Sequence, residues 1–229
     1  GGGGSGNDTF GNEQPLDSSQ AASNVGQATV LGAQLNAPWG LAFLPGGNML
    51  ITEKGGTVAL VNNTGANVLG RLDGPPSVDT TGQGGLLDIA LDTDFATTRW
   101  VFLSFSESGA GGAGTALARG TLNAGYNGWE QSPQVIWRQT PKVAAGPHYG
   151  ARIAFRNDQS LYLAVGERGM EANDGNARAD GVQNSGNTIG KVVRLNRDGA
   201  PADGSSLGIW STGHRNPQGA AVRPGTHEL

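Results

Sequence analysis

The chain has 229 residues, and its 15 basic and 19 acidic side chains give a formal net charge of −4. This charge argues against a nucleic-acid partner, because neutralising phosphates requires a concentrated basic surface. The absence of cysteine excludes disulfides, zinc-thiolate sites and a cysteine nucleophile. No apolar run reaches the roughly 18 to 20 residues that cross a bilayer, so no transmembrane segment is expected. The 40 glycines and 11 prolines indicate many tight turns, which favour an all-β chain of short strands.

Residues 1–26 are rich in Gly, Ser, Asn and Gln and have no apolar periodicity, which predicts a flexible leader. The opening Gly1–Gly4 lacks the basic and then apolar pattern of a signal peptide. A Gly/Ser leader is typical of a tether, and a tether of this kind also comes after the lipidated cysteine of an exported lipoprotein. Residues 27–229 form the second predicted region, which folds.

One phrase recurs along residues 27–229: a short apolar strand, a turn of Pro, Gly, Asp or Asn, and a second apolar strand. Its copies span residues 39–53, 85–107 and 150–167, and an unfinished fourth copy spans residues 219–229. When the copies are aligned, the same place before the turn is taken by Phe43, Leu91, Phe155 and Val222. Their spacings of 48, 64 and 67 residues suit one four-stranded blade of a β-propeller per repeat. A β-sandwich is the alternative, but it is not expected to restart one phrase four times.

A propeller removes its sheet edges by closing its ring, and three and a half blades do not close one. The sequence therefore predicts that the remainder of the ring belongs to a longer chain or to a second polypeptide.

A polar residue stands seven or eight positions before each of the four aligned residues. These residues are Asn36, Gln83, His148 and Arg215, and Asn216 follows the last of them. Loops that enter the innermost strand of each blade meet at one end of the propeller axis. We therefore expect these side chains to converge on one ligand site.

His148 is one of three histidines and is the candidate general base, because an imidazole ordinarily titrates at about pH 6.5. Glu167 ends the strand that pairs with the strand following His148, so its carboxylate is expected to fix the imidazole tautomer. The alternative is that His148 only bonds a loop carbonyl, while Glu167 pairs at the surface with Arg152 or Arg168.

Arg215 and Asn216 lie in the turn-forming stretch GHRNPQG. A planar, always charged guanidinium there suits a bound carboxylate or a quinone oxygen, and stapling of the loop is its alternative role. Glycines on both sides of Gln83 would let a ligand approach the main chain. Lys54 and Lys191 are expected to be solvent-facing charges at turns.

Asp174, Asn176 and Asp180 lie close together in the sequence but lack the spacing of an EF-hand loop. We expect a polar turn there and assign no metal ligand within the chain. The sequence also has no P-loop, no G-x-S-x-G elbow, no H-E-x-x-H motif and no dinucleotide fingerprint.

Five stretches together resemble the soluble PQQ-dependent sugar dehydrogenases of the glucose/sorbosone dehydrogenase family, and most closely their aldose sugar dehydrogenase branch. They are LNAPWGLAFLPGGNMLITE, GQGGLLDIALDTDFATTRWVFLSF, GPHYGARIAF with LYLAVGERG, GKVVRLNRDGAPADG and IWSTGHRNPQGAAV. The resemblance covers the chain from about Val30 to Leu229. It implies a six-bladed β-propeller of the superbarrel type, with pyrroloquinoline quinone (PQQ) and calcium on its axis, in a periplasmic or secreted protein. This chain would supply roughly the first three and a half blades.

By this resemblance, His148 is the catalytic base that takes the proton of the anomeric hydroxyl while a hydride passes to PQQ, so that an aldose becomes a lactone. Glu167 stands at the place of the acidic partner of that base. Gln83 stands beside substrate and cofactor, and Arg215 and Asn216 at the quinone oxygens. The resemblance places the calcium ligands beyond Leu229, so activity is expected to require the C-terminal part. The expected partners are a sugar substrate and an external electron acceptor.

Two other functions suit a propeller. A calcium-dependent lactonase requires axial Glu, Asn and Asp ligands, whereas the axial series here has no carboxylate at its main positions. A non-enzymatic binding module is the second alternative, and the joint presence of His148, Arg215 and Asn216 favours an enzyme over it.

Overall fold

The computed structural model describes residues 29–169 and 179–229 of the chain. Residues 32–229 form one compact unit. The predicted leader, residues 1–26, lies outside the described residues, and so does most of the polar segment around Asp174. The described helices are α2 (Phe95–Thr98) and α3 (Ala179–Gln183), and neither has the length or apolar character of a membrane span.

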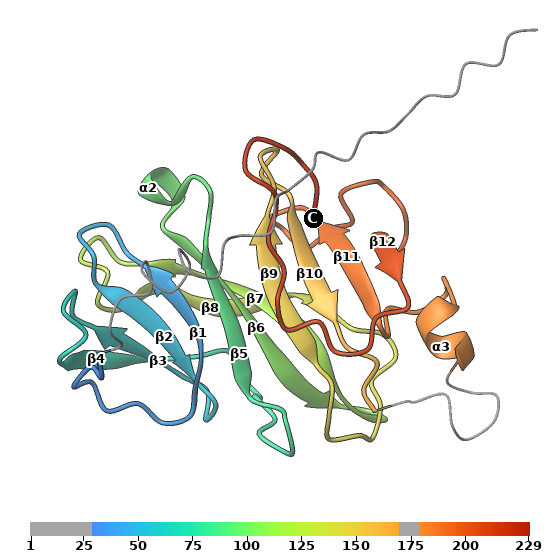
Figure 1. Ribbon diagram of the computed structural model, residues 1–229, viewed down its shortest axis with the longest axis horizontal. Coiled ribbons are helices and arrows are strands. Elements are labelled where there is room, and N and C mark those ends of the chain that lie inside the picture. The colour runs from blue at the N-terminus through green and yellow to red at the C-terminus, as the bar shows by residue number, and fades with distance from the viewer. Residues whose placement is uncertain (1–28, 170–178) are drawn as a thin grey trace, which may run out of the picture. The chain divides into compact units, whose positions relative to one another are not determined.

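Within the described residues, twelve strands form three four-stranded antiparallel sheets, and in each sheet the strands pair in sequence order (Figure 1). Sheet 1 consists of β1 (Pro38–Phe43), β2 (Met49–Glu53), β3 (Thr57–Val61) and β4 (Val68–Asp73). Sheet 2 consists of β5 (Leu86–Leu91), β6 (Trp100–Gly109), β7 (Gly112–Leu122) and β8 (Trp129–Arg138). Sheet 3 consists of β9 (Gly150–Phe155), β10 (Leu161–Val165), β11 (Lys191–Leu195) and β12 (Ile209–Thr212).

The recurring phrase of the sequence corresponds to the first two strands of each sheet. The aligned residues Phe43, Leu91 and Phe155 are the last residues of β1, β5 and β9. The alignment of the copies therefore has the correct register for three of its four members.

The fourth copy does not form a strand: none is present in residues 213–229. The turn expected at Pro224 is present, with the Arg223 amide donating to the Glu228 carbonyl at 2.9 Å. Val222 packs against sheet 3, where it contacts the cluster of Tyr162 and Val192. A strand needs a neighbour for its N–H and C=O groups, and no described residue pairs with this segment in a sheet.

The faces of adjacent sheets pack together and form two cores. One lies between sheets 1 and 2 and contains Leu60, Leu103 and Phe105. The second lies between sheets 2 and 3 and contains Phe102 and Leu163. Because both faces of the middle strands are covered, every residue of β2 and β10 is buried. An apolar run without alternation is the expected sequence for such a strand.

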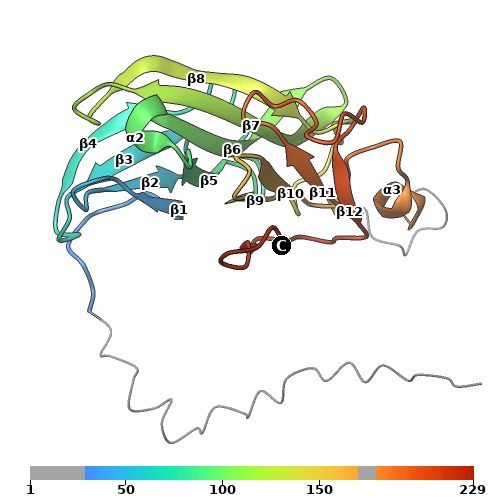
Figure 2. The ribbon, with the colours of Figure 1, turned by 90° about the horizontal axis from the view of Figure 1, so that it is seen from above.

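The first strands of the three sheets, β1, β5 and β9, are neighbours, and they lie on the inner side of the arrangement in Figure 2. An ion pair joins two of them: Asp88 Oδ1 accepts from Arg152 Nη1 at 2.7 Å, and Asp88 Oδ2 accepts from the Ile153 amide at 2.7 Å. This clamp fixes β9 against β5. It also excludes Arg152 as the partner of Glu167.

Candidate functional site

His148 and Glu167 meet at one end of the β9–β10 hairpin. Gly150 pairs with Val165 across the two strands, so the residues that flank this pair lie at the same sheet end. His148 Nδ1 is bonded to Glu167 Oε1. The His148 side chain is 13% exposed and the Glu167 side chain only 4%. The predicted pairing is therefore present, and the alternative of a surface Glu167 is wrong because the carboxylate is buried.

The bond to Glu167 selects the imidazole tautomer. An ionised carboxylate only accepts hydrogen bonds, so Nδ1 carries the proton in this contact and Nε2 keeps its lone pair. The second carboxylate oxygen, Oε2, is buried and has no hydrogen-bond partner in the described part of the chain.

The backbone of His148 has a left-handed conformation, with φ of 60°. Such a conformation costs a β-carbon-bearing residue about 1–3 kcal/mol, so the surroundings must hold it. The His148 amide donates to Gln83 Oε1 at 3.0 Å, and the His148 carbonyl accepts from the Arg168 amide at 3.2 Å. The backbone of His148 is thus held through both its N–H and its C=O group.

Gln83 connects the loop before β5 to the loop that carries His148. Its side-chain oxygen accepts from the His148 amide, and its backbone N–H donates to the Gly146 carbonyl at 3.0 Å. Lys54 Nζ donates to the carbonyl of Gly82 at 2.6 Å. Lys54 is half-buried and holds the Gln83 loop, which corrects its expected role as a solvent-facing charge. Its sequence position after β2 gave no sign of this contact, because the two loops are 28 residues apart.

The stretch that contains Arg215 and Asn216 closes the same site. The Glu167 amide donates to the Arg215 carbonyl at 2.8 Å, and the Gly150 amide donates to Asn216 Oδ1 at 3.0 Å. The Arg215 side chain is exposed, and Asn216 is half-buried with an NH2 group as its donor end. The structure therefore brings together the predicted Gln83, His148, Glu167, Arg215 and Asn216.

Asn36 is the predicted member that lies elsewhere. Its amide donates to Glu53 Oε1 at 2.7 Å, and it lines a pocket of about 330 Å³ together with Gln34, Asn67 and Arg71.

A repeated triplet in the sequence is a signal that the sequence reasoning missed. In each sheet, a Glu-x-Gly triplet stands at or just after the C-terminal end of the second strand. The triplets are Glu-Lys-Gly at 53–55, Glu-Ser-Gly at 107–109 and Glu-Arg-Gly at 167–169. The three glutamates are all buried. An alignment on this triplet would have identified Glu167 as one of three corresponding buried glutamates.

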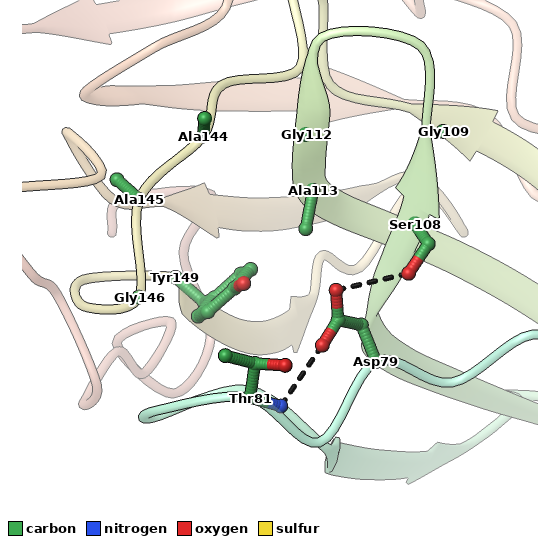
Figure 3. A pocket seen from close by; sticks show the side chains of 10 residues that line it. All are labelled: Asp79, Thr81, Ser108, Gly109, Gly112, Ala113, Ala144, Ala145, Gly146 and Tyr149. Carbon is green, nitrogen blue, oxygen red and sulfur yellow. Dashed lines mark hydrogen bonds between the residues drawn. The ribbon is translucent and has the colours of Figure 1, made fainter.

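A pocket of about 480 Å³ lies on the segment next to His148 (Figure 3). Gly146 and Tyr149, which flank His148, line it together with Asp79 and Ser108. The Asp79 carboxylate accepts from the Thr81 amide and from the Ser108 hydroxyl, each at 2.9 Å. These hydrogen bonds, that from Thr81 first, hold the pKa of Asp79 below its usual value.

The described residues contain no group of three or more His, Asp or Glu side chains that could hold a metal ion. The described part of the site thus offers one imidazole, one carboxylate and several amide and guanidinium donors. Such a set can take a proton and can bind an electron-rich, oxygen-bearing ligand, and it does not assemble a metal centre from carboxylates.

A comparison with known protein families matches residues 35–229 to the family described as Glucose / Sorbosone dehydrogenase. The chain belongs to this family. Among curated proteins, it is similar to the aldose sugar dehydrogenase YliI of Escherichia coli strain K12, with 38% identity over 210 residues that cover 87% of this chain and 54% of the relative. The quinoprotein glucose dehydrogenase B of Acinetobacter calcoaceticus is 27% identical over 233 residues, which cover 92% of this chain and 48% of that protein.

Solved structures of this dehydrogenase family give the same result. The apo form of the soluble aldose sugar dehydrogenase of Escherichia coli superposes with a TM-score of 0.72 at 39% identity, over 83% of this chain and 55% of that one. The PQQ-bound aldose sugar dehydrogenase of Streptomyces coelicolor superposes with a TM-score of 0.64 at 32% identity, over 80% of this chain and 52% of that one. The chain spans about half the length of the relatives that it matches.

Proposed function

We propose that this chain forms part of the active site of a quinoprotein that oxidises the anomeric carbon of an aldose to a lactone, with His148 as the general base. The observation that carries the proposal is the pairing of His148 Nδ1 with the buried Glu167 carboxylate in a chain of the Glucose / Sorbosone dehydrogenase family. With the proton on Nδ1, the Nε2 atom presents a lone pair that can accept a proton.

The proton transfer that we assign to His148 is required by the charge that develops on the sugar. As the C1–H bond gives up its hydride, C1 becomes positively charged, and loss of the O1 proton to Nε2 removes that charge as it forms. The imidazolium that results lies against Glu167, whose carboxylate stabilises it. PQQ, when bound, would accept the hydride.

The donors around His148 fit an electron-accepting quinone. Arg215 and the NH2 group of Asn216 lie on the stretch that closes the site, and we assign them to the quinone oxygens, where positive charge favours the reduced and more anionic form. We assign Gln83, which bonds the His148 amide, to the border of substrate and cofactor. We further propose that the enzyme binds calcium. Its ligands would then come from a part of the protein that corresponds to the half of the relatives outside the matched region.

The finer architecture and the surroundings of the enzyme are also proposals. Each four-stranded antiparallel sheet is the unit from which a β-propeller blade is built, and we propose a six-bladed ring. The free face of sheet 1, where Phe43 is 66% exposed, would then pack on a further blade. We propose that the enzyme acts in the periplasm or outside the cell and passes its electrons to an external acceptor. A lipid anchor ahead of the leader is the alternative to a free terminus.

The test is to reconstitute the complete protein with PQQ and calcium and to follow the reduction of a dye in the presence of aldoses. We expect sugar-dependent turnover, and a loss of about 10²- to 10⁴-fold in kcat for His148→Ala, the usual contribution of a general base. His227→Ala is the matched control, because His227 is an exposed histidine on the terminal turn. Turnover of no aldose, or hydrolysis of lactones without PQQ, would refute the proposal in favour of the lactonase or the binding module.

A further inference from the structure

Arg168 follows Glu167 in the sequence and is completely buried. Its guanidinium donates from Nη1 to the Ala113 carbonyl at 2.6 Å and from Nη2 to the Ala145 carbonyl. It also stacks on the ring of Tyr149, 3.5 Å from the ring centroid. The sequence suggested a surface ion pair between Arg168 and Glu167, whereas the guanidinium is held by carbonyls and by an aromatic face.

Burying a cation among mainly neutral groups costs desolvation free energy, so the stability of the fold alone does not explain Arg168. Burial lowers the pKa of Arg168, because desolvation penalises its charge. Nε is buried and makes no hydrogen bond in the described part of the chain. An apolar side chain of similar volume is often as stable at such a position, so the charge and the planar donors point to a further role.

The contacts of Arg168 surround His148. Ala145 lies three residues before the base, Tyr149 lies directly after it, and the Arg168 amide donates to the His148 carbonyl. The third acceptor, Ala113, belongs to β7 of sheet 2. A single side chain thus ties the segment of the base to a neighbouring sheet, and the preceding residue, Glu167, bonds the imidazole itself.

We propose that Arg168 is a positioning residue: it holds the strained segment of His148 so that the imidazole stays against Glu167 with Nε2 as its acceptor. The inference rests on the proposed function of His148 as a base. It assigns to Arg168 no contact with the sugar or the quinone.

The experiment uses Arg168→Gly in the complete protein. Because the backbone of Arg168 has φ of 63°, glycine fits this position without strain and the substitution removes only the side chain. Gln159→Gly is the matched control, since Gln159 is an exposed turn residue with φ of 69°. Nitrogen-15 NMR of the His148 ring reports the tautomer, and steady-state kinetics separates kcat from KM.

We expect the wild type and Gln159→Gly to carry the proton on Nδ1. We expect Arg168→Gly to show both tautomers and a kcat lowered by about tenfold or more with KM for the sugar nearly unchanged, since misplacing a reacting group by about 1 Å costs up to 10²-fold. Millimolar guanidinium should partly restore kcat and the Nδ1–H signal in Arg168→Gly, whereas urea should not. A purely structural role would not be rescued in this way.

Two results would overturn the inference: an unchanged ring spectrum and kcat in folded Arg168→Gly, or no recovery with guanidinium. Should that variant fail to fold, Arg168→Lys decides, because an ammonium cannot reproduce the planar stack and two parallel donations. A wild-type spectrum and kcat in Arg168→Lys would also overturn it. The NMR measurement needs no turnover and therefore separates the two proposals. If the wild type oxidises no aldose but Arg168→Gly still shows both tautomers, the proposed function is refuted and the positioning role stands.

Discussion

Sheet 3 differs from sheets 1 and 2 in the partner of one buried glutamate. In sheet 1, Glu53 takes two hydrogen bonds from Arg71, from Nε at 2.8 Å and from Nη2 at 3.1 Å. In sheet 2, Glu107 takes the same pair of bonds from Arg138, at 2.8 and 3.0 Å. In sheet 3, Glu167 bonds the imidazole of His148.

The strand register explains this difference. Ile51 stands two positions before Glu53, and Phe105 stands two positions before Glu107. Ile51 pairs with Ala59 on the next strand, and Ala59 pairs with Arg71 on the strand after that. Phe105 leads in the same way through Ala116 to Arg138. In sheet 3, Ala164 pairs with Val192, and Lys191, the residue before Val192, pairs with Thr212 on the next strand. A threonine is too short to reach the carboxylate. The glutamate thus pairs with an arginine in two sheets, and in the third sheet, where a threonine stands in place of the arginine, it pairs with the imidazole.

Among the variants that test this comparison of the three sheets, Glu167→Gln in the complete protein should have the largest effect. Loss of the carboxylate removes both the tautomer control and the stabilisation of the imidazolium, so we expect kcat to fall roughly 10- to 100-fold. Glu107→Gln is the matched control, since it breaks the equivalent pairing in sheet 2 and should leave kcat within twofold. Dye-reduction kinetics of both variants tests the comparison, and equal losses in the two would contradict it.

Glu53→Gln should reduce stability in a pH-dependent way. The hydrogen bonds from Arg71 first, and those from Asn36 and Thr57 next, lower the pKa of Glu53 from 4.5 to about 2. A lowered carboxyl pKa stabilises the fold above the unfolded value and ceases to do so as the pH falls through the folded value. We expect the variant to lose roughly 1–3 kcal/mol near pH 7, the cost of leaving buried partners unpaired.

Thermal unfolding of the wild type and of Glu53→Gln between pH 2 and pH 7 measures this effect. The difference between the two should shrink as the pH falls from about 4.5 towards 2. A difference that stays constant over this interval would show that Glu53 does not carry the acid sensitivity.

Lys191 should give a slope of the same sign at alkaline pH, where stability also rises with pH. Its side chain is buried in sheet 3, whereas the corresponding positions of sheets 1 and 2 hold the small residues Ala59 and Ala116. Desolvation lowers the pKa of Lys191 from 10.5 to about 8. Between these values the unfolded chain binds more protons than the folded one, so the stability contributed by Lys191 rises with pH. Relative to Lys191→Met, the wild type should gain stability from about pH 8 to 10.5. Urea unfolding checks this, and parallel curves would contradict it.

The smallest effect is expected for Thr212→Arg, which places an arginine where sheets 1 and 2 have one. The new guanidinium should compete with His148 for Glu167 and lower kcat roughly two- to fivefold, because a half-exposed ion pair is worth about 0.2–1 kcal/mol. Thr212→Met is the uncharged control of similar length. If both variants keep the wild-type kcat, a missing arginine is not what makes Glu167 available.

The membership of the site was largely predictable from the sequence. The repeated phrase placed Gln83 and His148 at equivalent positions before β5 and β9, and Arg215 at the same position in the unfinished fourth copy. Antiparallel pairing placed Glu167 beside His148. The same reasoning also included Asn36, whose amide bonds Glu53. Equal spacing before a strand does not determine the direction in which a loop turns after it leaves the sheet.

The charges that hold the site were not predictable. Lys54, Lys191 and Arg168 looked like surface residues, because a charge beside glycine is usually solvated. The structure shows Lys191 and Arg168 fully buried, with backbone carbonyls as acceptors, among them Gly181 for Lys191 and Ala113 and Ala145 for Arg168. Those carbonyls carry no signature in the amino-acid sequence, since every residue has one.

The sequence alone determined the all-β class, the repeated four-stranded unit and the residues able to move a proton, because hydrophobic periodicity and side-chain chemistry are local properties. Only the tertiary structure decided which of the three buried glutamates faces an imidazole and that Arg168 is buried against Ala145 and Tyr149, close to His148 in the chain. These choices depend on contacts between strands and loops that are far apart in the chain, and the free energy of a buried charge is set by such contacts.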